Sequence, residues 1–234
     1  MTLTLEELQN AYRKVIKGID TAARDSDDRA YGGIIRAGKG KLVENIVPHL
    51  VMGAWADLGG DSDRLSFHRS TIRVPIQDPY IRDLSPNVVR ERISENRNDY
   101  SYPARLDVPV QVDGETVLGI ECKTYTENAM LKRILVDFRL LKERFPRLKC
   151  ALVQLESQLG GDYSDLEADV VYGSTSSHTL MSYFPDVNLT IITLLEGERR
   201  VDAPIHLPEH YKDLHRASLE KAQATFGNLL RDFI

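Results

Sequence analysis

Cysteine and long apolar runs are scarce in this sequence, and each shortage excludes a class of protein. The 234 residues include two cysteines, Cys122 and Cys150, and one tryptophan. Two cysteines in stretches expected to be buried strands exclude a disulfide framework and a cysteine-rich zinc cluster. No apolar run approaches the roughly 20 residues that a membrane-spanning helix needs, and the N-terminus lacks the pattern of a signal peptide. We therefore expect a cytoplasmic protein without a membrane partner.

Lysine is absent between Lys41 and Lys123, whereas arginine is abundant there. Residues 64–105 hold eight arginines against five acidic residues. The net charge of −5 argues mildly against nucleic acid as a partner, because non-specific affinity comes from cations that meet phosphates. The distribution is more informative, since the planar guanidinium suits guanine edges and phosphates. Two explanations stay open: a DNA-facing surface, or a plain preference for arginine with solvated ion pairs.

A complete phosphate-binding loop is also missing. Residues 31–41 are rich in glycine and basic side chains, but they lack the full nucleotide-binding pattern, which excludes ATP binding. We predict instead a flexible segment that places Lys39 and Lys41 near a DNA backbone.

The remaining composition is that of an ordinary globular protein. Apolar residues make up 42% and charged residues 28% of the chain, and the length suits a single domain spanning residues 1–234. Thr4 and Glu7 form a capping box at the start of an amphipathic helix over residues 4–25. A mostly apolar helix over residues 42–57 contains Pro48, which predicts a kink or a later start. Further expected elements are a strand within 70–76, a helix over 87–95, a helix over 128–145, strands over 148–155 and 187–195, and helical structure over 209–233.

Residues 107–123 predict a β-hairpin around which the other elements are arranged. Valines alternate on the first arm, and apolar residues enrich the second. Asp113 and Gly114 stand between the arms, and this pair is a strong signal for a type I′ turn, which needs positive φ at both positions.

The hairpin brings acidic and basic side chains together. Along the second arm, Glu121 and Lys123 share one face while Ile120 and Cys122 take the other. The hairpin folds Asp107 back beside Glu121. Two carboxylates and an ammonium suit a hard divalent cation and an attacking water. The alternative is a surface hairpin with solvated charges; the acid on the facing arm, the apolar strand and the helix that follows favour catalysis.

These residues resemble a known motif. Asp107, thirteen intervening residues and then Glu121-Cys122-Lys123, followed by a helix and a strand, resemble the PD-(D/E)xK nuclease superfamily. The size and the upstream helices resemble most a type II restriction endonuclease. The residue before Asp107 is Leu106, where the motif has proline.

The resemblance covers residues 100–156 closely and 38–156 more loosely. It implies an α/β fold of the restriction-endonuclease type, with a mixed central β-sheet flanked by helices and a catalytic core at about 38–156. Residues 58–105 and 157–185 would then be DNA-recognition or dimer elements.

The resemblance also implies an activity: Mg²⁺-dependent, site-specific hydrolysis of phosphodiester bonds in double-stranded DNA. Asp107, Glu121 and the backbone carbonyl of Cys122 would hold Mg²⁺, and Lys123 would position the attacking water. Glu44, on the helix before the hairpin, matches an extra metal-site glutamate of related enzymes; the alternative is a charge that the helix dipole favours at a helix start. A two-fold homodimer would match a palindromic site.

Base contacts are expected on the approach to the hairpin, because asparagine and arginine read adenine and guanine. The candidates there are Arg97, Asn98, Tyr100 and Arg105. Three alternative functions stay open: a repair or junction-resolving nuclease of the same superfamily, a non-catalytic DNA-binding module, and a small-molecule metalloenzyme. The absence of a histidine-rich ligand set disfavours the metalloenzyme.

Overall fold

A five-stranded mixed β-sheet forms the centre of the molecule. The structure is a computed structural model that describes residues 3–24, 28–161, 163–164, 166 and 172–234, and the side chains of residues 20–36 are not among those described. Strands follow the order β1-β4-β5-β6-β7. β1, β4 and β5 are antiparallel neighbours, whereas β5, β6 and β7 run parallel. The strands are β1 Leu65–Ser66, β4 Val108–Val112, β5 Glu115–Glu127, β6 Lys149–Gln158 and β7 Thr190–Thr193.

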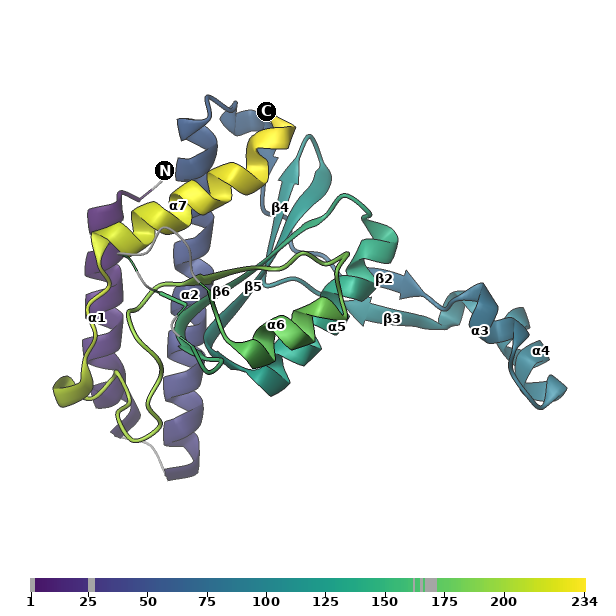
Figure 1. Cartoon of the computed structure of the whole chain (residues 1–234), viewed down its shortest axis with the longest axis horizontal. Coiled ribbons are helices and arrows are strands. Elements are labelled where there is room, and N and C mark those ends of the chain that lie inside the picture. Colours follow the sequence, from purple (N-terminus) through teal and green to yellow (C-terminus); the bar gives the residue numbers. More distant parts are fainter. Residues whose placement is uncertain (1–2, 25–27, 162, 165, 167–171) are drawn as a thin grey trace.

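Helices cover both faces of this sheet (Figure 1). On one face, α1, α2 and α7 pack against alternate side chains of β4, β5 and β6. On the other face, α5 packs against the opposite side chains of β6, and α6 lies beside α5. The predicted mixed α/β fold is therefore confirmed. The helices are α1 Leu5–Arg24, α2 Asp28–Asp57, α5 Asn128–Arg144, α6 Thr175–Ser182 and α7 Arg216–Leu230.

Local signals for α1 and for the hairpin are confirmed. Thr4 and Glu7 form the capping box, in which the backbone N–H of Thr4 donates to Glu7 Oε2 at 2.8 Å and the N–H of Glu7 donates to Thr4 Oγ1 at 3.2 Å. Asp113 and Gly114 have φ of 52° and 80°, as a type I′ turn requires.

The hairpin is not regular, because one residue of β5 is unpaired. Gln111 lies opposite Thr116 near the turn, but Val110 lies opposite Leu118. Val117 is therefore the extra residue of a β-bulge. A shift of one position exchanges the two faces of a strand, so the bulge decides which side chains of the two arms meet.

The prediction of a flexible segment at residues 31–41 is wrong. These residues form part of α2, which starts at Asp28 and continues through Pro48. Glycines weaken a helix by up to about 1 kcal/mol each, yet Gly38 has a packing role. A Cβ there would lie 2.3 Å from Cδ1 of Ile19 in α1. The missing side chain lets α1 and α2 approach each other closely at this point. The contact joins residues distant in the chain, so the local sequence does not predict it.

An arm projects from the compact part of the molecule (Figure 1). It consists of the two-stranded sheet β2–β3 with α3 and α4 beyond it. The predicted helix over 87–95 is confirmed as α4. The bounds are β2 Ile72–Pro75, α3 Asp78–Arg82, α4 Asn87–Glu95 and β3 Ser101–Ala104.

Both cysteines are buried and unpaired, as expected. Among the described helices, none is both long and apolar enough to cross a membrane. Part of the predicted recognition or dimer element at 157–185, namely 162, 165 and 167–171, lies outside the described residues.

Two glycine substitutions test the backbone assignment. Gly40→Ala raises the free energy of unfolding by about 0.5–1 kcal/mol, because alanine is the better residue inside a helix and its Cβ meets no atom within 4 Å. Gly114→Ala lowers it by about 1–2 kcal/mol, because φ of 80° strains an L-residue. Denaturant unfolding measures both. An unchanged free energy of unfolding for Gly40→Ala would contradict the helix at residue 40 and favour the predicted loop at residues 31–41.

Candidate active site

The bulge at Val117 brings the catalytic candidates onto one sheet face. In the register set by the turn, Asp107 would fall opposite Ile120. Beyond the bulge, Val108 lies opposite Ile120, so Asp107 falls opposite Glu121 instead. Opposed residues of an antiparallel pair share a face, and Asp107 therefore joins Glu121 on the face that α5 covers.

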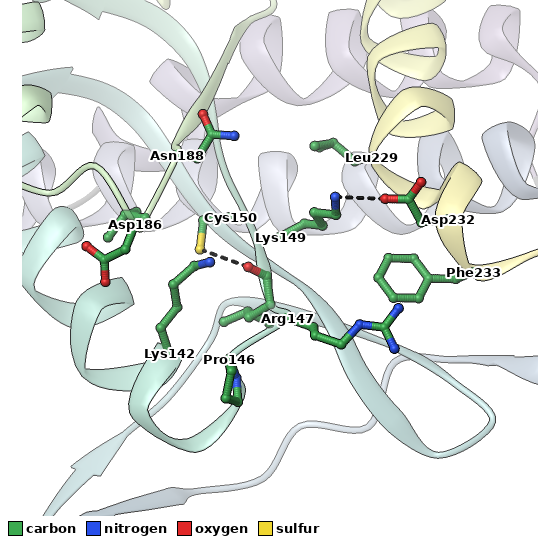
Figure 2. A pocket seen from close by; sticks show the side chains of 12 residues that line it. Lys142, Pro146, Arg147, Lys149, Cys150, Asp186, Asn188, Leu229, Asp232 and Phe233 are labelled. Atoms are coloured by element: carbon green, nitrogen blue, oxygen red, sulfur yellow. Dashed lines mark hydrogen bonds and ion pairs between the residues drawn. The ribbon is translucent and has the colours of Figure 1, made fainter.

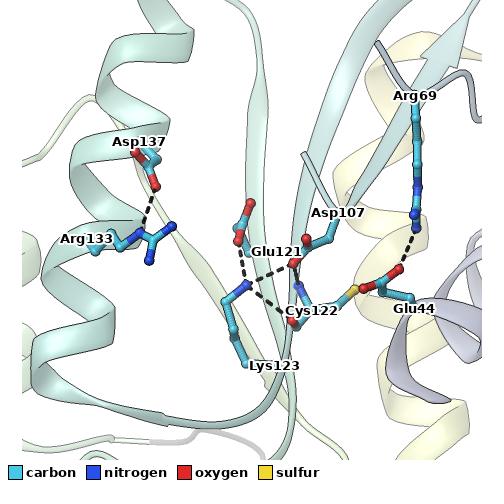
Figure 3. A network of polar contacts seen from close by, with 8 residues as sticks. All are labelled: Glu44, Arg69, Asp107, Glu121, Cys122, Lys123, Arg133 and Asp137. Atoms are coloured by element: carbon cyan, nitrogen blue, oxygen red, sulfur yellow. Dashed lines mark hydrogen bonds and ion pairs between the residues drawn. The ribbon is translucent and has the colours of Figure 1, made fainter. Parts of the chain in front are cut away.

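Lys123 is the centre of the resulting cluster (Figure 3). Its ammonium donates to Asp107 Oδ2 at 2.9 Å, to Glu121 Oε2 at 2.7 Å and to the backbone oxygen of Cys122 at 3.2 Å. The backbone N–H of Cys122 also donates to Asp107 Oδ2, at 2.8 Å. The structure thus brings together four of the five residues of the predicted metal and catalytic set, and Glu44 is the fifth.

Burial and charge act against each other in this cluster. The side chain of Glu121 is 13% exposed, and its pKa rises from 4.5 to about 7 because burial disfavours the carboxylate, a penalty that Lys123 reduces and Asp107 increases. Burial also lowers the pKa of Lys123, but Glu121 and Asp107 outweigh it and the pKa lies above its ordinary value. Even with the ammonium of Lys123 beside it, the Glu121 carboxyl has a pKa of about 7, so a further cation would favour its ionised form at neutral pH.

The donor set suits a hard divalent cation. Three oxygens, from Asp107, Glu121 and the Cys122 carbonyl, converge on one point that the ammonium of Lys123 occupies. Carboxylate and carbonyl oxygens are the ligands that Mg²⁺ prefers. Among the described residues, no group of three His, Cys, Asp or Glu side chains gathers around a common point, so two side chains and one backbone oxygen are what this cluster offers.

Glu44 lies beside the cluster but has other partners (Figure 3). Arg69 donates to Glu44 Oε2 at 2.9 Å, and Lys41 Nζ lies 3.5 Å from the same oxygen. Because α2 begins at Asp28, Glu44 is in the interior of a helix, and the helix-start explanation for its charge is wrong. Its role at a metal site stays a prediction.

Lys39 does not belong to an exposed basic surface, which corrects the prediction that it faces DNA. Its side chain is 6% exposed, and Nζ lies 3.3 Å from His206 Nδ1. Burial lowers the pKa of Lys39 to about 8. Lys41, by contrast, is exposed. Two residues apart on a helix, Lys39 and Lys41 point to different sides, so one is buried and the other exposed. The prediction of a loop over residues 31–41 gave no reason to expect this difference.

The other predicted DNA contacts lie along the arm, where Arg97, Asn98 and Tyr100 connect α4 with β3 and Arg105 follows β3. Arg97, Asn98 and Tyr100 line a groove of about 560 Å³, together with Arg144 from α5. Arg105 is exposed and donates to Thr71 Oγ1 at 3.1 Å. Three of the four residues predicted from composition therefore share a groove, and the local sequence did not indicate that Arg144 of α5 contributes to it.

Sequence reasoning missed three charged residues around the cluster: Arg69, Arg133 and Asp137. Arg133 and Asp137 stand one turn apart on α5, with Asp137 next to the buried Phe138. The sequence offered one signal for the α5 pair: Asp137 stands next to a position expected to be buried, and Arg133 carries the opposite charge four residues before it.

A second cavity, of about 410 Å³, lies away from this cluster (Figure 2). It is lined by the connection between α5 and β6 and by the C-terminal residues, and Lys149 pairs with Asp232 at 2.9 Å inside it. Lys149 lies beside Leu118 in the parallel register, near the turn end of β5. The cavity is thus distinct from the cluster at Lys123.

The raised pKa of Glu121 predicts a pH dependence of stability when a chelator removes divalent cations. Between pH of about 4.5 and 7 the folded protein holds a proton on Glu121 that the unfolded chain has lost. The free energy of unfolding therefore falls as pH rises through this window, by at most about 1.4 kcal/mol per pH unit from this group. Glu121→Gln removes that part of the slope, whereas Glu115→Gln, at the exposed end of the same strand, keeps it. Equal slopes for all three proteins in denaturant unfolding would contradict the burial of an ionisable Glu121.

Comparison with known proteins identifies the family. No protein-family model matches the chain. Its sequence is 48% identical over 222 residues to the type II restriction enzyme DdeI of Desulfomicrobium norvegicum, and the match covers 93% of this chain and 92% of DdeI. The native BbvCI A2B2 tetramer, solved at low resolution, is a distant structural neighbour, with a TM-score of 0.38 and 9% identity over 98% of this chain and 89% of that chain; this likeness is too low to support an inference. On the identity to DdeI, the chain belongs to the type II restriction enzymes.

Proposed function

We propose that this type II restriction enzyme, a site-specific DNA endonuclease, hydrolyses phosphodiester bonds of double-stranded DNA at the Asp107–Glu121–Lys123 cluster, with Mg²⁺ as its cofactor. The observation that carries the proposal is the convergence of three oxygens on the ammonium of Lys123. That point already holds one positive charge, so its surroundings are suited to a cation.

Each residue of the cluster has a distinct part in the proposed reaction. Asp107, Glu121 and the Cys122 carbonyl would hold Mg²⁺, which when bound supplies a Lewis acid for the phosphate and lowers the pKa of a bound water. Lys123 donates hydrogen bonds to the attacking water or to phosphate oxygens, and its charge offsets the charge that develops at phosphorus. Glu121 gives up its proton when a cation lies beside it, so ionisation and cofactor binding are coupled.

Two alternatives are less well supported. A repair or junction-resolving nuclease would use the same cluster, but the identity to DdeI favours cleavage of ordinary duplex at defined sites. A non-catalytic DNA-binding module has no need of Asp107, Glu121 and Lys123 in contact.

Cleavage of a long, sequence-diverse duplex tests the proposal. The unaltered protein with Mg²⁺ produces discrete fragments, and a chelator abolishes them. Lys123→Ala lowers the rate of cleavage at least about 100-fold, because one preorganised charged donor is lost. Lys149→Ala is the matched control, since this strand lysine pairs with Asp232 outside the cluster, and it cleaves at the unaltered rate.

The other outcomes separate the alternatives. Random degradation of the duplex would support nuclease activity but contradict site specificity. Cleavage of branched DNA alone would favour the junction-resolving enzyme. A protein that binds duplex DNA without cutting it, with or without Mg²⁺, would contradict the proposed catalysis.

We also propose a two-fold homodimer on DNA, with residues 58–105 and 157–185 as its recognition or dimer elements. Two equivalent active sites would then address the two strands of a symmetric site. Light scattering of the protein with a cleavable duplex and Ca²⁺ in place of Mg²⁺ gives a protein mass of twice the 26.5 kDa chain. One chain per duplex at saturation would contradict the dimer.

A further inference from the structure

The helix α5 presents a pair of charged residues beside the catalytic cluster. Arg133 and Asp137 are one turn apart, and Nε of Arg133 lies 3.7 Å from Oδ2 of Asp137. Figure 3 shows Arg133 reaching from α5 toward the side on which Glu121 and Lys123 lie. The proposed metal ligands and their lysine do not include this pair, so its presence needs a separate explanation.

Asp137 connects the cluster with the projecting arm. Its Oδ1 accepts a hydrogen bond from the hydroxyl of Tyr102 in β3, at 3.4 Å. Its charge also contributes to the raised pKa of the Glu121 carboxyl, which places the two carboxylates within electrostatic reach. Asp137 therefore stands between Tyr102 on the arm side and Glu121 on the catalytic side.

Stability does not explain the pair. The side chain of Arg133 is 84% exposed, and an exposed ion pair at this separation contributes little to folding. Asp137 adds a further negative charge near Asp107 and Glu121, which costs free energy. This site is also the one that the negatively charged backbone of DNA must approach, so a cation here has a use in binding that it lacks in folding.

The guanidinium of Arg133 is suited to a phosphate. Asp137 is contacted through Nε, and among the described residues the two terminal amino groups of Arg133 make no hydrogen bond. A planar guanidinium with terminal N–H groups directed to solvent can donate two parallel bonds to a phosphate. Asp137 limits the rotamers of a long and otherwise mobile side chain, which lowers the entropy lost on binding.

We propose that Arg133 binds a backbone phosphate of the DNA strand at the active site, and that Asp137 and Tyr102 are positioning residues that hold its side chain. This inference rests on the proposed nuclease function, because it places the phosphate beside the Asp107–Glu121–Lys123 cluster. The link from Tyr102 makes the position of Arg133 depend on the arm.

The test uses a duplex that the unaltered protein cuts, with its site located from the fragment ends. Affinity is measured over a series of salt concentrations with Ca²⁺ in place of Mg²⁺. Arg133→Ala weakens binding about tenfold or more, and the slope of log affinity against log salt falls in magnitude by about 1, as expected for one lost phosphate contact. Lys132→Ala is the control: it removes an exposed cation that lies about 100° around the same helix, and it changes the slope little.

Conservative variants separate positioning from folding. Arg133→Lys keeps the charge, so it retains the salt slope and loses only part of the affinity. Asp137→Asn and Tyr102→Phe each weaken binding a few-fold and raise KM more than they lower kcat, with denaturant midpoints that stay near that of the unaltered protein. A purely structural role would lower the midpoint and leave KM unaltered.

The outcomes distinguish this inference from the function beneath it. If the unaltered protein cuts DNA and Arg133→Ala has the salt slope and affinity of Lys132→Ala, the phosphate contact is wrong and the proposed nuclease stands. If Arg133→Ala does not fold, an affinity of Arg133→Lys equal to that of the unaltered protein would overturn the inference. If the unaltered protein does not cut DNA, the proposed nuclease function is wrong, and the inference about Arg133, which rests on it, falls with it.

Discussion

A single ammonium held between two carboxylates, of which Glu121 is mostly buried, is the constraint on which the site depends. Lys123 contacts Asp107 and Glu121 at 2.9 and 2.7 Å, and Glu121 is buried enough for its pKa to reach about 7 even with that cation present. The ammonium of Lys123 lowers the pKa of Glu121 and so offsets part of the effect of burial and of the neighbouring Asp107. The arrangement that holds Lys123 between the two carboxylates also suits this point to Mg²⁺, and Arg133 adds a second cation beside Asp137.

The geometry that creates this constraint depends on one unpaired residue. A two-residue turn followed by a regular ladder would direct Asp107 and Glu121 to opposite faces. The bulge at Val117 corrects the register, and the Asp113-Gly114 turn keeps its favoured conformation at the same time. The bulge thus links a local turn preference to the chemistry several residues away.

Features encoded by neighbouring residues could be predicted from the sequence, and features made by distant contacts could not. The hairpin turn, the capping box at Thr4 and the helix over 87–95 follow from local chemistry and are confirmed. The shared face of Glu121 and Lys123 follows from strand alternation. The loop that the sequence predicts over residues 31–41 is wrong, because the packing that favours Gly38 in a helix comes from α1, which is distant in the chain. The hydrogen bond between Tyr102 of the arm and Asp137 of α5 joins residues 35 positions apart in the sequence, and no local pattern predicts it.

The most direct test of this account is a crystal structure of the protein with a cleavable duplex and Ca²⁺. The account predicts a cation bound by carboxylate oxygens of Asp107 and Glu121 and the carbonyl of Cys122, with the ammonium of Lys123 directed to a water or a phosphate oxygen at the scissile bond. A cation bound elsewhere on the protein, with Lys123 still bridging the two carboxylates and the scissile phosphate remote from them, would contradict it.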